Sequence, residues 1–137
     1  MAVKYPHMLP REERIWDAFC ERYGTPEGLI RYDVHLGSGA AVDEAWPEWM
    51  KVCVKALSTH RADVVVERLR EVVIVEVKSI AGMGAVGQCV GYEALWLKEY
   101  GTKRPVTLLC VCERLEADIA SVFQFYDIGL VELGDVG

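Results

Sequence analysis

The chain has 137 residues, of which 52% are hydrophobic and 26% charged, and its net charge is −6. This size and composition fit one folded domain, residues 1–137, with a single buried core, and they exclude a disordered chain. The negative charge argues against a protein that coats nucleic acid through bulk electrostatics. It is compatible with an enzyme that brings phosphate to a bound cation, because the cation then carries the local positive charge.

The sequence gives two indications of where the protein works. Its apolar runs are all shorter than the roughly 20 residues that span a bilayer, and the first residues lack the apolar centre of a signal peptide. We therefore expect a cytoplasmic protein with no membrane partner. The five cysteines each have apolar neighbours and no zinc-site spacing, so we expect buried free thiols and no structural zinc.

The first predicted helix covers residues 9–24, with Pro10 in its first turn and Gly24 at its end. Glu12 lies near the middle of the apolar stripe of this helix, and Glu13 lies toward the edge of that stripe. Either carboxylate could belong to a functional site. The alternative is that they cap or solvate the first turn, where anions are favoured, and this interpretation is preferred for Glu13.

A strand is predicted over residues 29–36, with Tyr32, Val34 and Leu36 on one face and His35, a weak site candidate, on the other. Glycines then break the chain. Residues 47–57 have the apolar spacing of a short helix, although a strand also fits. Positive charges gather around this segment, and they fit either a solvated surface or a rim that contacts phosphate.

The centre of the chain is a predicted hairpin over residues 61–78, with β-branched runs at 64–66 and 72–77. Glu76 and Lys78 leave the same face of the second strand, and Asp63 begins the partner strand close to Glu76. Two carboxylates and a lysine at the end of an apolar hairpin are costly to bury, and a divalent cation would offset that cost. The alternative is an exposed Glu-x-Lys pair that protects a sheet edge.

A glycine-rich turn over residues 79–87 leads into a helix predicted for 85–100. Gln88 and Tyr92 share one face of this helix and could orient a phosphate or a water, or simply form a polar surface with a half-buried tyrosine. The glycine spacing lacks the strand and acidic partner of a dinucleotide site. A strand at 105–112 with two covered faces, a helix at 115–125 and a short strand at 129–133 complete the chain.

The element order and the residues Asp63, Glu76-x-Lys78 and Gln88-x-x-x-Tyr92 together resemble the PD-(D/E)xK nuclease superfamily. The likeness is greatest to its RecB-like and archaeal Holliday junction resolvase-like branches, and it covers roughly residues 12–111. The Pro-Asp of the family is Ala62-Asp63 here, which keeps the aspartate. The resemblance implies an α/β fold with a restriction-endonuclease-like core (αβββαβ) and a mixed central sheet flanked by helices.

The resemblance also implies roles for individual residues. Asp63, Glu76 and the carbonyl of Val77 would hold Mg²⁺ or Mn²⁺. Lys78 would position the attacking water and stabilise the charged phosphate.

Three further residues would complete the family's site. Glu12, with Glu13 as the alternative, would be the acidic residue of the first helix. Gln88 and Tyr92 would support the site from the later helix.

We therefore expect a metal-dependent deoxyribonuclease that acts on DNA, as a homodimer or beside a protein partner that selects the substrate. A metal ion lowers the pKa of bound water and neutralises phosphate charge, which makes this hydrolysis feasible at neutral pH. The first alternative is a catalytically silent module of the same fold that binds nucleic acid or protein. A weaker alternative is a nucleotide-binding protein that uses the turn at 82–87.

Overall fold

The computed structural model describes residue 5 and residues 8–137. Its centre is a five-stranded sheet with strand order β1-β2-β3-β4-β5. The β1/β2 and β2/β3 pairs are antiparallel, and the β3/β4 and β4/β5 pairs are parallel, so the sheet is mixed. The strands are β1 (Leu29–Leu36), β2 (His60–Glu67), β3 (Val72–Ala81), β4 (Val106–Leu115) and β5 (Ile128–Glu132).

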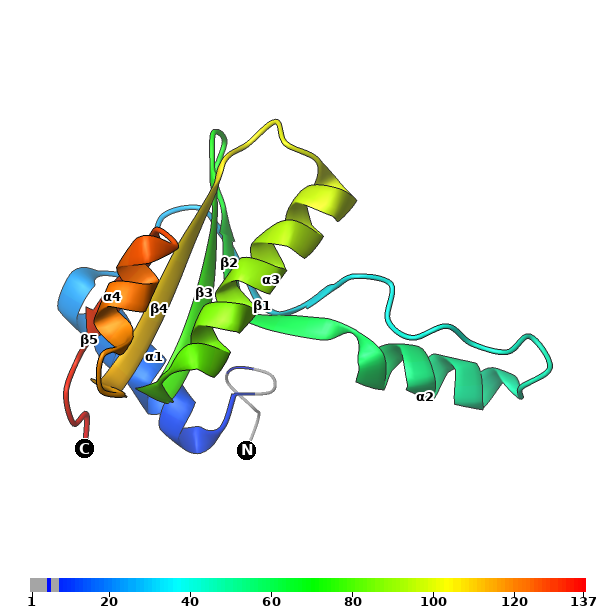
Figure 1. The fold of residues 1–137 in the computed structure, drawn as a ribbon, viewed down its shortest axis with the longest axis horizontal. Helices are drawn as coiled ribbons and strands as arrows, with labels where there is room; N and C mark the ends of the chain where they lie inside the picture. Colours follow the sequence, from blue (N-terminus) through cyan, green and yellow to red (C-terminus); the bar gives the residue numbers. More distant parts are fainter. Residues whose placement is uncertain (1–4, 6–7) are drawn as a thin grey trace.

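Helices cover both faces of this sheet (Figure 1). Helix α1 (Pro10–Tyr23) packs on one face against β3 and β4, while α3 (Met83–Tyr100) crosses the other face and links the parallel strands β3 and β4. Helix α4 (Ile119–Phe125) packs beside β5. The αβββαβ order and the mixed sheet flanked by helices confirm the fold class predicted from the sequence.

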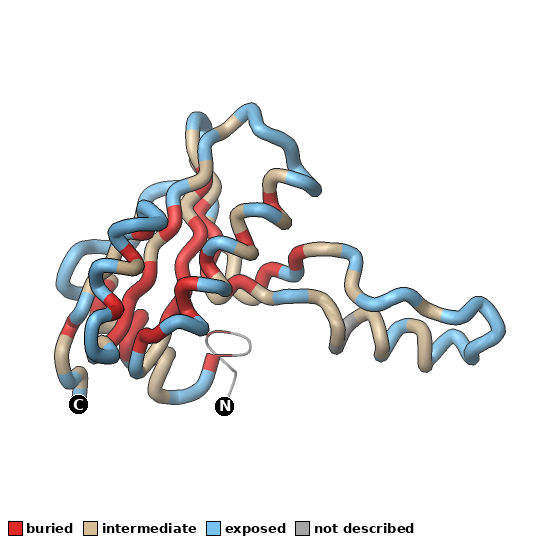
Figure 2. Tube along the Cα trace, in the orientation of Figure 1, coloured by how far each residue is buried: buried red, intermediate tan, exposed pale blue. Residues whose placement is uncertain are grey.

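The apolar core is divided by the sheet into two clusters. Val72 and Ile74 face α3, whereas Val75 and Val77 face α1, so β3 is buried on both sides (Figure 2). A central strand between two helical layers reads as a near-continuous β-branched run for this reason. By the same alternation, Glu76 leaves β3 on the α3 side.

The expected alternation of β1 is wrong in one respect. Tyr32 packs into the cluster beneath α1, but Val34 and Leu36 belong to the cluster beneath α3. Between them, Asp33 has a positive φ of 52°, which reverses the side of the sheet to which the following residues point. Aspartate tolerates this region better than most residues, but simple period-two patterning does not reveal it.

An arm leaves the body of the protein between β1 and β2. It carries α2 (Glu48–Ser58), which projects beyond the sheet instead of covering it (Figure 1). Residues 47–57, for which the sequence allowed a helix or a strand, therefore form a helix. Within the arm, residues 37–60, none of the side chains that the structure describes is fully buried.

Two further expectations need adjustment. Strand β4 continues to Leu115, which lies opposite Ala81 of β3, so α4 begins later than predicted, at Ile119. The cysteines are all free, but they are not all buried: Cys53 on α2 is exposed. Within the described part of the chain, no helix is long and apolar enough to span a membrane.

Candidate functional site

The candidate site lies where β2 and β3 separate. Their ladder ends at the pair Val64 and Val75; beyond it β2 continues with β1, and β3 continues with β4. We call this point the fork. It leaves backbone groups of both strands without a strand partner, and it places Asp63 and Glu76 on its two sides.

The Asp63 carboxylate replaces the missing strand partner of Val77. The amide nitrogen of Val77 donates a hydrogen bond to Asp63 Oδ2 at 2.8 Å. In a strand, the N–H and C=O of one residue point toward the same neighbouring strand, so the carbonyl of Val77 also faces the fork. Asp63 therefore holds the backbone of β3 in place at the position where the fork opens.

Glu76 is the buried acid of the site. It is 3% exposed, and its Oε2 atom has no hydrogen-bond partner among the described residues. Burial and, next, the negative charge of Asp63 raise the pKa of Glu76 to about 9. Burial also raises the pKa of Asp63, although the hydrogen bonds that it shares with Glu76 and with the Val77 amide oppose the shift. Two adjoining carboxylates with raised pKa values mark an unusual environment.

Lys78 supplies the positive charge of the cluster. Its Nζ lies 3.7 Å from Glu76 Oε1, and its side chain is 31% exposed, so the ammonium stays within reach of solvent. Its charge lowers the pKa values of both Glu76 and Asp63, but burial outweighs this effect in each case. The ammonium thus sits at the mouth of a buried pair of acids.

Glu12 combines the two roles that the sequence left open. Its Oε1 accepts a hydrogen bond from the amide of Leu9 at 3.0 Å, which completes the first turn of α1. Burial raises the pKa of Glu12, with a contribution from the charge of Asp63. Lys78 acts in the opposite direction. The carboxylate therefore caps its helix and also interacts electrostatically with the cluster.

Tyr92 and Gln88 approach the site from α3. Tyr92 is buried and hydrogen-bonds Glu76, and this contact lowers the pKa of Glu76. Gln88 and Tyr92 both line a pocket of about 520 Å³ that also borders His60 at the base of the arm. The remaining lining consists of small or apolar residues of α3: Gly84, Gly87, Gly91, Ala94 and Leu95.

Two further residues of the cluster, Asp33 and Cys89, were not predicted from the sequence. Asp33, at the reversal in β1, contributes to the raised pKa of Asp63. Cys89 of α3 is fully buried, and its pKa is raised to about 12 by burial and by the charge of Glu76. Apart from the residue type, nothing in the sequence indicates the backbone reversal at Asp33. Cys89 could have been expected near the site, because it directly follows Gln88 on the apolar side of α3.

The oxygen atoms around Asp63 and Glu76 are candidate ligands for a metal ion. Among residue 5 and residues 8–137, no group of three or more His, Cys, Asp or Glu side chains is arranged to hold an ion. Asp63 and Glu76 nevertheless form a pair of carboxylates with one orphaned oxygen, beside a carbonyl that faces the fork. Mg²⁺ is commonly bound by one or two carboxylates and keeps several waters, so this set fits a magnesium-type ion.

The start of α3 is unfavourable for a nucleotide. The carboxylate of Glu116 lies against Gly82, so closely that a side chain at Gly82 would collide with it. A phosphate at this helix N-terminus would meet that negative charge. The position of Glu116 argues against nucleotide binding at the turn of residues 82–87.

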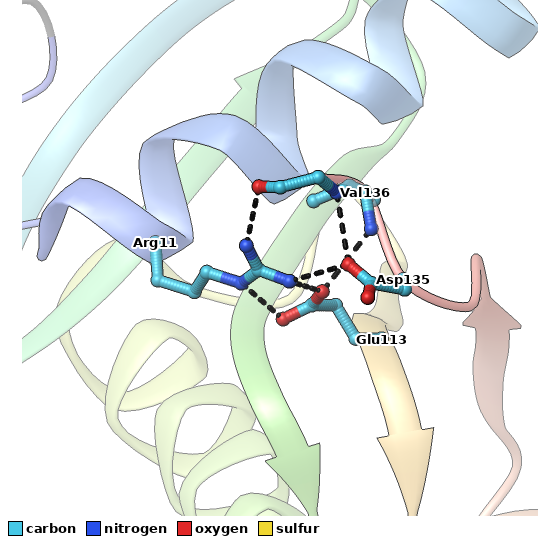
Figure 3. A network of polar contacts seen from close by, with 5 residues as sticks. Arg11, Glu113, Asp135 and Val136 are labelled. Atoms are coloured by element: carbon cyan, nitrogen blue, oxygen red, sulfur yellow. Dashed lines mark hydrogen bonds and ion pairs between the residues drawn. The ribbon is translucent and has the colours of Figure 1, made fainter.

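A second polar network joins α1 to the end of the chain (Figure 3). Arg11 donates to both carboxylate oxygens of the buried Glu113, to Asp135 at 2.8 Å and to the carbonyl of Gly137 at 2.6 Å. The amide of Val136 also donates to Glu113. Bonding to Arg11 lowers the pKa of Glu113. This network fixes the first turn of α1, and therefore the neighbouring Glu12, relative to β4.

Comparison of the sequence with protein-family profiles and with curated proteins finds no match. The fold is similar to the crystal structure of a repair endonuclease from Pyrococcus abyssi, with a TM-score of 0.53 and 16% sequence identity. The likeness covers 97% of this chain and 50% of the other, so this chain spans about half the length of that protein. At this identity the likeness establishes the restriction-endonuclease-like fold.

Proposed function

We propose that the protein is a metal-dependent nuclease that hydrolyses DNA phosphodiester bonds, a member of the PD-(D/E)xK superfamily close to its RecB-like and Holliday junction resolvase-like branches. One observation carries the proposal: the buried Glu76 keeps an unpartnered carboxylate oxygen next to Asp63, with Lys78 at the mouth of the pair. Burying such a group is costly unless a ligand completes it.

The ligand that best completes the pair is Mg²⁺ or Mn²⁺. Asp63, Glu76 and the carbonyl of Val77 would hold it, leaving other positions for water and for a phosphate oxygen. When bound, such an ion lowers the pKa of a coordinated water and neutralises charge on the phosphate. Without it, the raised pKa of Glu76 means that the site keeps a proton near neutral pH.

Lys78 would act on the substrate. A partly exposed ammonium 3.7 Å from Glu76 can reach a phosphodiester that approaches the fork. There it would orient the attacking water and stabilise the negative charge that develops on the phosphate oxygens. Glu12, which interacts electrostatically with Asp63 and Lys78, would help to orient that ammonium.

Tyr92 and Gln88 would position the other groups. Tyr92 holds Glu76 by hydrogen bonding, so its expected role is to fix the carboxylate that binds the ion. Gln88 faces the pocket next to Tyr92 and could hydrogen-bond a phosphate or a water there. His60 lies across the same pocket, which makes it a further group within reach of DNA.

The second candidate is a catalytically silent module that uses this fold to bind DNA or a protein. The observation in its favour is that the described residues lack a cluster of three metal-binding side chains. Against it stands the cost of burying Asp63 and Glu76 together, which a binding module has no need to bear. The acidic net charge fits either a partner-assisted nuclease or a protein-binding module.

The two candidates can be separated by comparing wild type with Lys78→Ala on plasmid and branched DNA, with Mg²⁺, Mn²⁺ or EDTA. Lys98→Ala, at an exposed position of α3, is the matched control. The nuclease proposal expects metal-dependent cutting by wild type and the control, and a loss of about 100-fold or more for Lys78→Ala. DNA binding without cutting by wild type under every condition would instead favour the silent module.

A further inference from the structure

The arm helix α2 is incompletely supported by its own chain. It has 11 residues and no side-chain cap at its N-terminus, whereas isolated helices shorter than about 12–15 residues are marginal in water. It projects away from the sheet (Figure 1), and the described side chains around it stay exposed or half-buried (Figure 2). Such a helix gains stability when its apolar face packs against a partner.

The exposed side of α2 carries an apolar stripe. Trp49 is 66% exposed and Val52 is 61% exposed, and the exposed Cys53 follows them at helical spacing. Positions i, i+3 and i+4 share one face of a helix. Tryptophan is enriched at the centres of protein interfaces, because it buries a large apolar area. We call Trp49, Val52 and Cys53 the arm stripe.

The charges beside the arm stripe indicate what could cover it. Glu48 and Lys55 are one heptad apart, so they lie on the same flank of the stripe, two helical turns from each other. In a parallel pair of α2 helices, this flank would face the opposite flank of the partner, so Glu48 and Lys55 would gain no charged partner from each other. In an antiparallel pair centred near Val52, Glu48 of each helix would face Lys55 of the other, twice by symmetry.

The existing contacts of these two residues leave room for this pairing. Lys55 Nζ donates to the carbonyl of Ser38 at 2.8 Å, and an ammonium has two further donors. Glu48 Oε2 lies 3.8 Å from Lys51 Nζ and is strongly exposed, so this contact is weak. Both groups can therefore take a second partner without losing a strong bond.

We propose that a second copy of this chain docks on the arm stripe, with two α2 helices packed antiparallel about a two-fold axis near Val52. The stripe is then self-complementary in shape, and its flank is self-complementary in charge, as an isologous interface requires. This inference concerns the arm and is independent of the nuclease proposal.

The first test is the oligomeric state of the full chain by sedimentation equilibrium over a range of protein concentrations. We expect wild type to form a dimer and Trp49→Lys to weaken it by at least 100-fold, which is about 2.8 kcal/mol at 1.4 kcal/mol per tenfold, because central aromatic residues dominate the binding energy of such interfaces. Phe125→Lys is the matched control, since Phe125 is an 81% exposed aromatic residue on α4. Circular dichroism checks that both variants fold.

The second test addresses the orientation. Glu48→Lys and Lys55→Glu should each weaken the dimer, because each places like charges opposite one another twice. The double variant should recover dimerisation, and raised salt should diminish the effects of both single substitutions. A parallel pair predicts no such recovery.

Three results would overturn the proposal. A wild type that remains monomeric at high protein concentration excludes self-association. A dimer that persists in Trp49→Lys uses another surface. A monomeric wild type whose DNA binding is lost in Trp49→Lys but kept in Phe125→Lys identifies the stripe as a nucleic-acid contact instead.

Discussion

The amide of Val77 and the carboxylate of Asp63 are joined by a 2.8 Å hydrogen bond across the fork of β2 and β3. This bond gives Asp63 a structural role in addition to the ligand role proposed for it. A substitution can separate the two roles only if it keeps an oxygen acceptor for the amide while it removes the negative charge.

Asp63→Asn is such a substitution. The asparagine oxygen can still accept from Val77, and the buried negative charge of Asp63 disappears, so we expect the metal-free protein to gain about 1 kcal/mol of unfolding free energy. Mn²⁺ binding and DNA cutting should be lost. Urea denaturation and isothermal titration calorimetry measure the two effects.

Asp63→Ala is the contrasting control. It removes the acceptor as well as the charge and leaves the Val77 amide unsatisfied, so the gain should vanish or become a loss of about 1–3 kcal/mol. Equal stabilities of the Asn and Ala variants would contradict the structural role of this hydrogen bond.

The stability of the metal-free protein should fall as pH rises. The pKa of Glu76 is raised in the folded state to about 9, so the folded state binds its proton more tightly than the unfolded state does. The stabilisation from the protonated Glu76 is complete below the pKa of Glu76 in the unfolded state. It is lost progressively as the pH rises to the pKa of Glu76 in the folded state. Between about pH 6 and pH 8 we expect a decrease of about 3 kcal/mol from this group in EDTA, measured by urea denaturation.

Glu76→Gln is the control for that dependence. Glutamine does not titrate, so the decrease attributed to Glu76 should be absent, while other titrations remain. Mn²⁺ should restore stability to wild type more strongly at about pH 8 than at about pH 6, because the ion competes with the proton. A wild type and a Glu76→Gln variant with the same pH dependence would show that Glu76 is not the titrating group.

Tyr92→Phe should affect the site through Glu76. Without the phenolic hydroxyl, the charged form of Glu76 loses a hydrogen-bond donor, and its pKa rises further. We expect DNA cutting to fall by about tenfold and its pH profile to move toward higher pH. Tyr100→Phe, at an exposed position of the same helix, should leave both unchanged. A simple loss of rate without a shift would indicate a role apart from Glu76.

Replacing the glycines of α3 that face the pocket with alanine should not destabilise the protein. A Cβ at Gly87 or Gly91 would meet nothing within 4 Å, and alanine is a better helix former than glycine. Each alanine variant should therefore add about 1 kcal/mol to the unfolding free energy in urea. Gly101→Ala is the opposite case, because Gly101 has a φ of +85°, and it should destabilise the protein.

The features that could be predicted from the sequence are those that depend on the spacing of residues close together in the chain. The β-branched runs gave β2 and β3, and the positions of Asp63, Glu76 and Lys78 on them led to the expectation of a shared site. Glu12 could be placed on α1 from its apolar stripe, but not assigned to capping or to the site, because that depends on how α1 packs on the sheet.

The remaining features arise from contacts between distant segments. The reversal at Asp33 follows from one backbone angle that most residue patterns do not encode. The later start of α4 follows from the pairing of Leu115 with Ala81, which extends β4 into the predicted helix. The helical spacing of the apolar residues in α2 could not show whether this helix covers the sheet. The same spacing fits a helix face that packs into the core and a face that is exposed to solvent.

The separation of β2 and β3 also has a structural consequence. Asp63 lies on β2, which follows the arm directly, while Glu76 of β3 pairs with Cys110 on the neighbouring parallel strand β4. The arm is therefore continuous with the strand of Asp63, whereas the strand of Glu76 belongs to the parallel half of the sheet. The hydrogen bond from the Val77 amide to Asp63 directly links these two halves at the fork.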